Sequence, residues 1–153
     1  MTDAIELLLV EDNPSDAELT LHVLKKHKLA NRIKLVRDGA EALEFLFGDE
    51  SGQSGSAGNV PKVILLDLKL PKVNGLEVLG RVKADPRTKN IPVVVLTSSR
   101  EDRDLFVCYE LGVNSYIVKP VDFAQFTEAV HQLGLYWLLF NERPRLQVER
   151  AAT

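Results

Sequence analysis

The sequence is poor in residues that stabilise small folds through disulfides or metals. It has a single cysteine, Cys108, among 153 residues, which excludes an internal disulfide and any four-cysteine metal site. Basic residues are not in excess: 19 Lys and Arg face 22 Asp and Glu, and this balance argues against non-specific nucleic-acid binding. No apolar run approaches the roughly 20 residues that a membrane-spanning helix needs, and no signal peptide is visible. We therefore expect one cytoplasmic domain that binds neither nucleic acid nor membrane.

Five short apolar runs rich in β-branched residues recur along the chain. Most lack alternation of polar and apolar residues, which is typical of parallel strands covered on both faces. The runs are Ile5–Val10, Arg32–Val36, Val63–Leu66, Pro92–Leu96 and Ser115–Val118.

The segments between these runs carry apolar residues at helical spacing, and capping residues agree with that spacing. Pro14 suits a first helical turn, Asp38 and Asp122 suit caps, and Gly112 suits a helix end. The expected apolar stripes are Ala17, Leu21, Leu24; Ala40, Leu43, Leu46; Leu76, Leu79, Val82; Leu105, Cys108, Leu111; and Phe126, Val130, Leu133, Trp137. The alternation predicts a (βα)5 chain folded as a doubly wound parallel α/β sheet with helices on both sides.

We expect a single domain over residues 1–142, followed by a polar tail over residues 143–153. Residues 48–59 are rich in Gly and Ser and predict a flexible loop, and the last helix is expected over residues 122–141.

Polar side chains stand where four of the predicted strands end. The first strand ends in Glu11 and Asp12, the third in Asp67, the fourth in Thr97 and the fifth in Lys119. In an open α/β sheet the carboxyl ends of the strands form the ligand site. Neighbouring carboxylates repel by about 4 kcal/mol per pair at an effective dielectric near 20, and Mg²⁺ is the cation that such oxygen ligands suit. Each acid alone could equally be a solvated loop end or a cap, but the set favours a site.

A carboxylate beside a metal, a lysine and a hydroxyl suits phosphoryl transfer to an aspartate. Asp67 is the best nucleophile because its strand is central. Asp12 and Glu11 then hold the metal, while Lys119 neutralises phosphoryl oxygens and Thr97 donates a hydrogen bond.

Four segments, LLLVEDNPSD, VILLDLKLPKVNG, IPVVVLTSS and LGVNSYIVKP, occur in this order over residues 5–133. Together they resemble the receiver domain of two-component response regulators. The resemblance implies a flavodoxin-like fold of strand order 2-1-3-4-5 and a phosphoacceptor in phosphorelay signal transduction, without dedicated substrate turnover beyond its own phosphorylation and dephosphorylation.

The resemblance implies that the phosphohistidine of a histidine kinase phosphorylates Asp67. Asp12, Asp67 and the backbone carbonyl of Lys69 would ligate Mg²⁺, and Glu11 would act through a bound water.

It also implies a switch, in which Thr97 moves to the phosphoryl group and Tyr116 then rotates inward. Lys119 would pair with a phosphoryl oxygen, and Pro120 would follow a cis peptide bond. Tyr116 has an alternative interpretation as ordinary packing in a half-buried strand.

The last predicted helix extends beyond the usual end of a receiver and is apolar on several sides. We expect self-association through helices four and five, unless the helix breaks at Gly134 and folds back on the monomer. The expected interface residues are Leu135, Trp137, Leu138, Leu139 and Phe140. The segment LYWLLFNERP, with the loop over residues 48–59, also resembles stand-alone regulators that partner bacterial and cyanobacterial phytochromes, which implies a phytochrome as the kinase.

Two alternatives stay open. A receiver-like scaffold could act by binding without phosphorylation. A small α/β phosphatase is disfavoured because Lys69 occupies the position where that class needs a second acid.

Overall fold

The computed structural model describes seven stretches of the chain, and every structural statement below concerns them. They are residues 6–26, 32–48, 60–97, 107–113, 115–119, 124–125 and 128. The strands are β1 (Leu7–Val10), β2 (Ile33–Val36), β3 (Val63–Asp67), β4 (Val93–Thr97) and β5 (Ser115–Val118). The helices are α1 (Pro14–Lys26), α2 (Gly39–Phe47) and α3 (Gly75–Ala84). Residues 107–110 are also helical.

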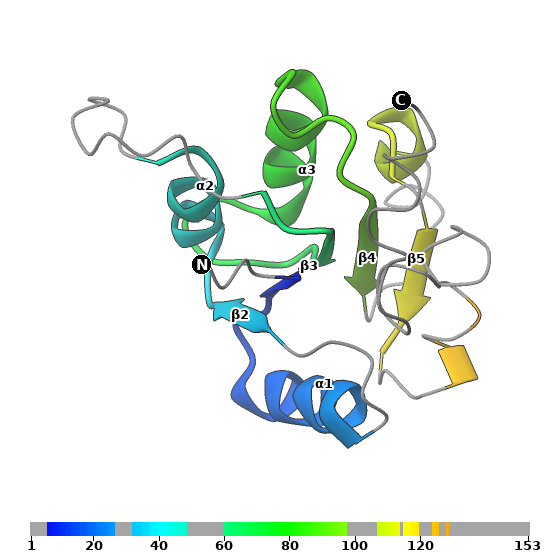
Figure 1. Cartoon of the computed structure of the whole chain (residues 1–153). Coiled ribbons are helices and arrows are strands. Elements are labelled where there is room, and N and C mark those ends of the chain that lie inside the picture. Colours follow the sequence, from blue (N-terminus) through cyan, green and yellow to red (C-terminus); the bar gives the residue numbers. More distant parts are fainter. Residues whose placement is uncertain are drawn as a thin grey trace, which may run out of the picture.

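All five strands pair in parallel in the order β2-β1-β3-β4-β5, which confirms the predicted fold (Figure 1). From β1 the chain passes to β2 on one side, and it then returns to form β3 on the other side of β1. The strand order therefore reverses between β1 and β3, and their carboxyl ends flank the position where an open α/β sheet forms its binding site.

Helices lie on both faces of the sheet, with α1 on one side and α2 and α3 on the other (Figure 1). Alternate residues of β1 enter two separate apolar clusters, as the two-residue period of a strand requires. Leu7 and Leu9 pack with Leu24 of α1, whereas Leu8 packs with Leu46 of α2 on the opposite face. Burial on both faces explains why the predicted strands lack polar alternation.

Three predicted helix boundaries are confirmed. Helix α1 begins at Pro14, and the Asp38 carboxylate accepts a hydrogen bond of 2.7 Å from the backbone N–H of Glu41 as the N-cap of α2. Gly112 has a φ of 97°, and the N–H of Val113 donates to the carbonyl of Cys108 behind it (3.0 Å), which is how a glycine-terminated helix ends.

One apolar stripe was predicted wrongly. The buried residues of α2 are Gly39, Ala42 and Leu46, whereas Ala40 is exposed. The face with Ala42 and Leu46 packs on the sheet, and Ala40 and Leu43 border a groove between α2 and α3 instead. Asp67 and Thr97 are the last residues of β3 and β4, at the strand ends where the sequence placed them.

Several predicted features lie outside the described residues. They are the loop after Gly48, the cap at Asp122, the polar tail and most of the last helix, of which residues 124, 125 and 128 are helical. Among the helices that the structure describes, none is long and apolar enough to cross a membrane.

Candidate functional site

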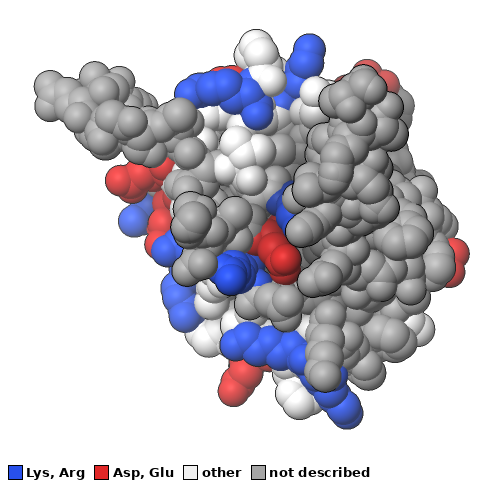
Figure 2. All heavy atoms as spheres, viewed as in Figure 1, with Lys and Arg blue, Asp and Glu red and all other residues white. Residues whose placement is uncertain are grey.

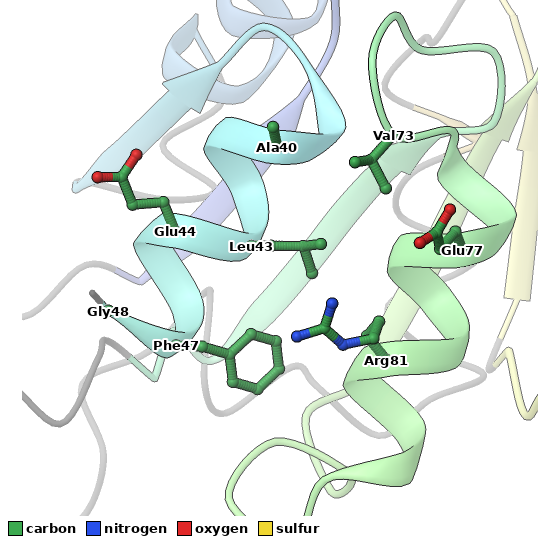
Figure 3. A pocket seen from close by; sticks show the side chains of 8 residues that line it. All are labelled: Ala40, Leu43, Glu44, Phe47, Gly48, Val73, Glu77 and Arg81. Atoms are coloured by element: carbon green, nitrogen blue, oxygen red, sulfur yellow. The ribbon is translucent and has the colours of Figure 1, made fainter. Parts of the chain in front are cut away.

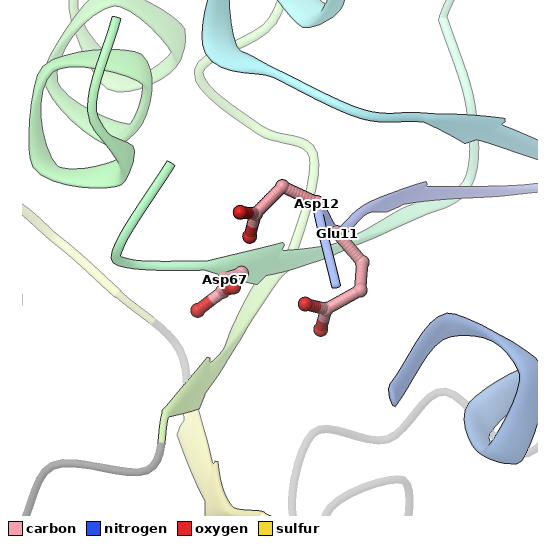
Figure 4. Close-up of side chains that lie close together, drawn as sticks. All are labelled: Glu11, Asp12 and Asp67. Atoms are coloured by element: carbon pink, nitrogen blue, oxygen red, sulfur yellow. The ribbon is translucent and has the colours of Figure 1, made fainter. Parts of the chain in front are cut away.

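Three carboxyl side chains converge at the carboxyl ends of β1 and β3. Val10 pairs with Leu66 in register, so Glu11 and Asp12 leave β1 beside Asp67 at the end of β3. The side chains of Glu11, Asp12 and Asp67 lie close together at this edge of the sheet (Figure 4), and each offers an oxygen within 4.8 Å of the others. Neither strand alone carries this cluster; the reversal of strand order assembles it.

Lys119 brings its ammonium group into the same cluster from the residue after β5. Its Nζ lies 2.9 Å from Glu11 Oε1 and 3.2 Å from Asp67 Oδ2. It also lies 2.9 Å from Oδ2 of Asp16, a residue that the sequence did not single out. The side chain of Lys119 is only 11% exposed, so water screens these contacts weakly. Burial by itself lowers the pKa of Lys119, but hydrogen bonds to Glu11 and Asp16 raise it above its ordinary value.

Glu11 is fully buried, and its two oxygens differ. Oε2 accepts hydrogen bonds from Lys119 Nζ (3.0 Å) and from the backbone N–H of Asn13 (3.2 Å). Oε1 lies close to the ammonium nitrogen but accepts no hydrogen bond from the described residues. Burial, helped by the charge of Asp67 and opposed by the Lys119 hydrogen bond, raises the pKa of Glu11 to about 7.

The residues fit a hard divalent cation. Three carboxylates, those of Glu11, Asp16 and Asp67, contact the one ammonium group of Lys119, and the carboxylate of Asp12 adjoins two of them. The buried Oε1 of Glu11 has the ammonium nitrogen near it but accepts no hydrogen bond from the described residues. A cation that binds carboxylate oxygens and water would reduce the repulsion between the carboxylates and would also give that oxygen a partner. Mg²⁺ is such a cation. Asp12 is half-buried, and an ion could reach the cluster on its side.

The loop after β3 places Lys69 directly beside Asp67. The backbone N–H of Lys69 donates to Asp67 Oδ1 at 3.3 Å, and Lys69 itself is exposed between two buried leucines, Leu68 and Leu70. This loop therefore fixes one carboxylate oxygen of Asp67, while Lys119 contacts the other.

The structure describes only some of the remaining predicted site residues. Thr97 ends β4 opposite Val118, at the same edge of the sheet, and its side chain lies outside the described residues. Tyr116 is half-buried in β5, and its ring meets Tyr109 edge to face with centroids 6.3 Å apart. That contact is compatible with both interpretations of Tyr116. Neither Pro120 nor the expected interface residues are among the residues described; the latter are Leu135, Trp137, Leu138, Leu139 and Phe140.

Seen from outside, acidic side chains are visible in a hollow near the middle of the face drawn in Figure 2, with basic side chains beside them. Lys69 and Lys72, on the loop between β3 and α3, are among the exposed basic residues of the described part. A deep acidic site with a basic rim suits an anionic phosphoryl donor once a cation has neutralised the carboxylates.

Asp16 is the main site residue that sequence reasoning missed. The N–H of Asp16 donates to Asn13 Oδ1 at 3.0 Å, so a cap at Asn13 holds the first turn of α1 over the cluster. An acid in the first turn of a helix right after Glu11-Asp12 was the available signal. Acids at that position are common for capping reasons alone, so the signal is weak.

Comparison with known proteins gives a consistent family. The family model of the response regulator receiver domain matches residues 7–131. The "Probable methanogenesis regulatory protein FilR2" of Methanothrix harundinacea is 42% identical over 142 residues, which cover 93% of this chain and 89% of that protein. "Response regulator Rcp1" of Synechocystis is 40% identical over 134 residues, 86% of this chain and 88% of Rcp1.

Solved structures agree in fold and in sequence. The bacteriophytochrome response regulator AtBRR is 54% identical with a TM-score of 0.77, over 92% of this chain and 100% of that one. The phosphorylated cyanobacterial phytochrome response regulator RcpA is 39% identical with a TM-score of 0.72, and the match covers 93% of this chain and 99% of that one. The Mn²⁺-bound form of Rcp1 is 37% identical with a TM-score of 0.70, and the match covers 92% of this chain and 99% of that one.

Proposed function

The chain belongs to the response regulator receiver family, and on that premise we propose that Asp67 accepts a phosphoryl group from a histidine kinase in a Mg²⁺-dependent reaction. The single observation that carries the proposal is the buried cluster in which Asp67 lies between two further carboxylates and Lys119. Proteins of this family are phosphoacceptors rather than enzymes that turn over a separate substrate.

In the proposed step a carboxylate oxygen of Asp67 attacks the phosphorus of a phosphohistidine. A phosphorus–oxygen bond forms as the phosphorus–nitrogen bond breaks, and the imidazole nitrogen leaves with the bonding electron pair. The other ring nitrogen of the phosphohistidine carries a proton, so the products are an aspartyl phosphate and a neutral histidine. Lys119 stays protonated beside Asp67 and stabilises negative charge on the phosphoryl oxygens.

Asp12, Asp67 and the backbone carbonyl of Lys69 are the proposed Mg²⁺ ligands, with Glu11 acting through water. When bound, the ion would neutralise negative charge on the carboxylates and on the phosphoryl oxygens. The unsatisfied Glu11 oxygen and the Mn²⁺-bound form of the relative Rcp1 both support this assignment.

Thr97 and Tyr116 are the proposed switch that reports phosphorylation, and Pro120 remains the proposed cis-proline. Thr97 ends β4 at the edge of the sheet where Asp67 ends β3. Tyr116 lies on the neighbouring strand, and its half-buried ring contacts the ring of Tyr109. Rotation of the Tyr116 side chain would break that contact.

A phytochrome is the proposed kinase, because AtBRR and RcpA carry that association in their names. Phosphotransfer to this chain from a phytochrome kinase should be faster than transfer from an unrelated histidine kinase. Equal rates from both kinases would contradict the proposed partner.

We propose a homodimer through the last helices, one domain over residues 1–142 with a polar tail, and a cytoplasmic location. The apolar residues 135–140 support the dimer. A chain ending at Leu133 should sediment as a monomer where the full chain sediments as a dimer. A shortened chain that stays dimeric would contradict an interface at residues 135–140.

Intact-mass measurement tests the phosphoacceptor directly. The full chain is incubated with acetyl phosphate and Mg²⁺, and Asp67→Asn is treated in parallel as the matched control. We expect one phosphoryl adduct on the wild type, none on Asp67→Asn, and none on either when EDTA removes the metal. An unmodified wild type, or an adduct that persists in Asp67→Asn, would instead favour a scaffold that acts without phosphorylation.

A further inference from the structure

The loop over residues 68–74, which leads from Asp67 to α3, is held by the first residues of two helices. The N–H of Gly75, which begins α3, donates to the carbonyl of Leu68 at 2.8 Å. The N–H of Gly39, which begins α2, donates to the carbonyl of Pro71 at 3.4 Å. The first N–H groups of a helix have no partner inside it, so the loop carbonyls satisfy both of them.

Both helices need glycine at this position because the loop backbone is in the way of a side chain. A Cβ on Gly39 would overlap the carbonyl oxygen of Val73, and a Cβ on Gly75 would overlap that of Asp67. Figure 3 shows Val73 beside Ala40 in the first turn of α2. By contrast, a Cβ on Gly80, inside α3, would meet nothing closer than a Leu111 methyl at 3.9 Å. The first turn of α2 therefore rests on the backbone of the loop itself.

Asp38, the N-cap of α2, ties the same turn to the loop a second time. Its Oδ1 accepts from the N–H of Glu41, and its Oδ2 lies 3.5 Å from Nζ of Lys72. Lys72 has a φ of 66°, a left-handed conformation that residues other than glycine seldom adopt. Such a conformation persists when surrounding contacts fix it, and α2 supplies those contacts here.

The loop is short, so a displacement at its far end reaches the site. Lys69 lies between Leu68 and Leu70, which are 5% and 9% exposed and anchor the backbone on both sides. The Lys69 N–H meets Asp67 Oδ1, and its carbonyl is a proposed metal ligand. Because the buried side chains of Leu68 and Leu70 leave this short segment little slack, moving Val73 away from α2 would shift Pro71 and Leu70 and, with them, turn the Lys69 peptide groups.

We propose that Gly39 and its cap Asp38 are positioning residues for the Asp67 site: they hold the loop so that Lys69 presents its backbone to Asp67 and to the metal. This inference rests on the proposed function and deepens it. Neither residue touches the phosphoryl group or the ion; both act through the loop.

The test compares Gly39→Ala with Gly80→Ala, the same substitution at a helical glycine that has room. Calorimetry measures Mg²⁺ affinity of the metal-free chains, NMR measures hydrogen exchange of the Lys69 amide, and acetyl phosphate gives the phosphorylation rate. We expect Gly39→Ala to weaken Mg²⁺ binding about 10-fold, as loss of outer-shell support does, and to speed exchange at Lys69. Gly80→Ala should match the wild type in all three.

A second set of variants decides the matter if Gly39→Ala does not fold. Asp38→Ala removes the cap and the Lys72 contact, and it should weaken Mg²⁺ binding in the same direction by less. Asp38→Asn keeps a capping oxygen and should restore most of the affinity. Thr88→Val is the control for stability alone, because the buried Thr88 hydroxyl donates to the Val82 carbonyl (2.7 Å) at the other end of α3. It should lower stability without changing Mg²⁺ affinity.

Different results would overturn the positioning inference and the proposed phosphoacceptor function. If the wild type is phosphorylated and binds Mg²⁺ while folded Gly39→Ala and Asp38→Ala match it, the positioning inference is overturned and the phosphoacceptor stands. If the variants weaken Mg²⁺ binding but the wild type accepts no phosphoryl group, the positioning inference stands and the proposed function fails. A wild type that binds no Mg²⁺ overturns both.

Discussion

Replacing Lys119 by methionine is the sharpest test of how the acidic cluster is held together. Methionine keeps an unbranched side chain of similar length and removes the charge. The fully buried Glu11 and the nearly buried Asp67 then lose the ammonium group that lies 2.9 and 3.2 Å from them. Breaking one side of a buried ion pair costs about 3–5 kcal/mol, because each remaining carboxylate either stays buried without compensation or has to take up a proton, as Glu11 does most readily with its pKa already raised to about 7. The Asp16 contact adds about 0–1 kcal/mol, since that side chain is 36% exposed.

We therefore expect Lys119→Met to lower the free energy of unfolding by about 3–5 kcal/mol in metal-free buffer at neutral pH. Urea unfolding followed by circular dichroism measures it. The matched control is Lys62→Met, which removes the half-exposed pair with Glu6 (3.8 Å) and should cost about 0–1 kcal/mol.

Two further arms of the same experiment separate charge from packing. Mg²⁺ should stabilise Lys119→Met more than the wild type, because the variant cluster has one positive charge fewer. In an Asp67→Asn background the cost of Lys119→Met should shrink, because one repelling carboxylate is gone. A loss below about 1 kcal/mol that is insensitive to Mg²⁺ and to Asp67 would refute the electrostatic reasoning and leave Lys119 as a packing residue.

Three other outcomes are expected. Leu65→Ala, at a fully buried position of the central strand β3, should lower the unfolding free energy by about 2–5 kcal/mol in urea titration, and a loss under 1 kcal/mol would contradict the packing described. Mg²⁺ at about 100 times its dissociation constant should raise the unfolding free energy of the wild type by about 2.7 kcal/mol, and Asp12→Asn should reduce that gain; equal gains would remove Asp12 from the metal site. Three hydrogen bonds from Arg87, two from its guanidinium and one from its backbone N–H, hold the pKa of Asp85 at about 2, down from 3.8, so its contribution to stability is present above pH 3.8 and is lost as the pH falls toward 2. Unfolding curves of Asp85→Asn should therefore lie below the wild type at neutral pH and meet it near pH 2, whereas a constant gap would contradict the ion pair.

The sequence predicted the features that depend on local pattern and on sheet topology. Apolar runs without polar alternation identified β1 and β3, and the position of Asp67 at the end of a central strand identified the expected acceptor. Lys119 was predicted at the same edge because parallel strands share one carboxyl end.

Features that depend on side-chain contacts across the fold were not predicted. Asp16 meets Lys119 across 103 positions of sequence, and helix-capping statistics alone explain an acid there. Ala40 fits a helical stripe as well as Ala42 does, and only the packing of α2 on the sheet decides which of them is buried. Gly39 looks like an ordinary glycine after a cap until the carbonyl of Val73 is placed against it.

The central claim is that Asp67 is the phosphoryl acceptor, and chemical mapping tests it most directly. Borohydride reduces an aspartyl phosphate to homoserine, so peptide mass mapping after treatment with acetyl phosphate and Mg²⁺ identifies the acceptor. We predict homoserine at position 67 and at no other acid of the cluster. Homoserine at Asp12 or Asp16, the corresponding five-carbon amino alcohol (2-amino-5-hydroxypentanoic acid) at Glu11, or no reduced residue in a fully treated sample would contradict the account.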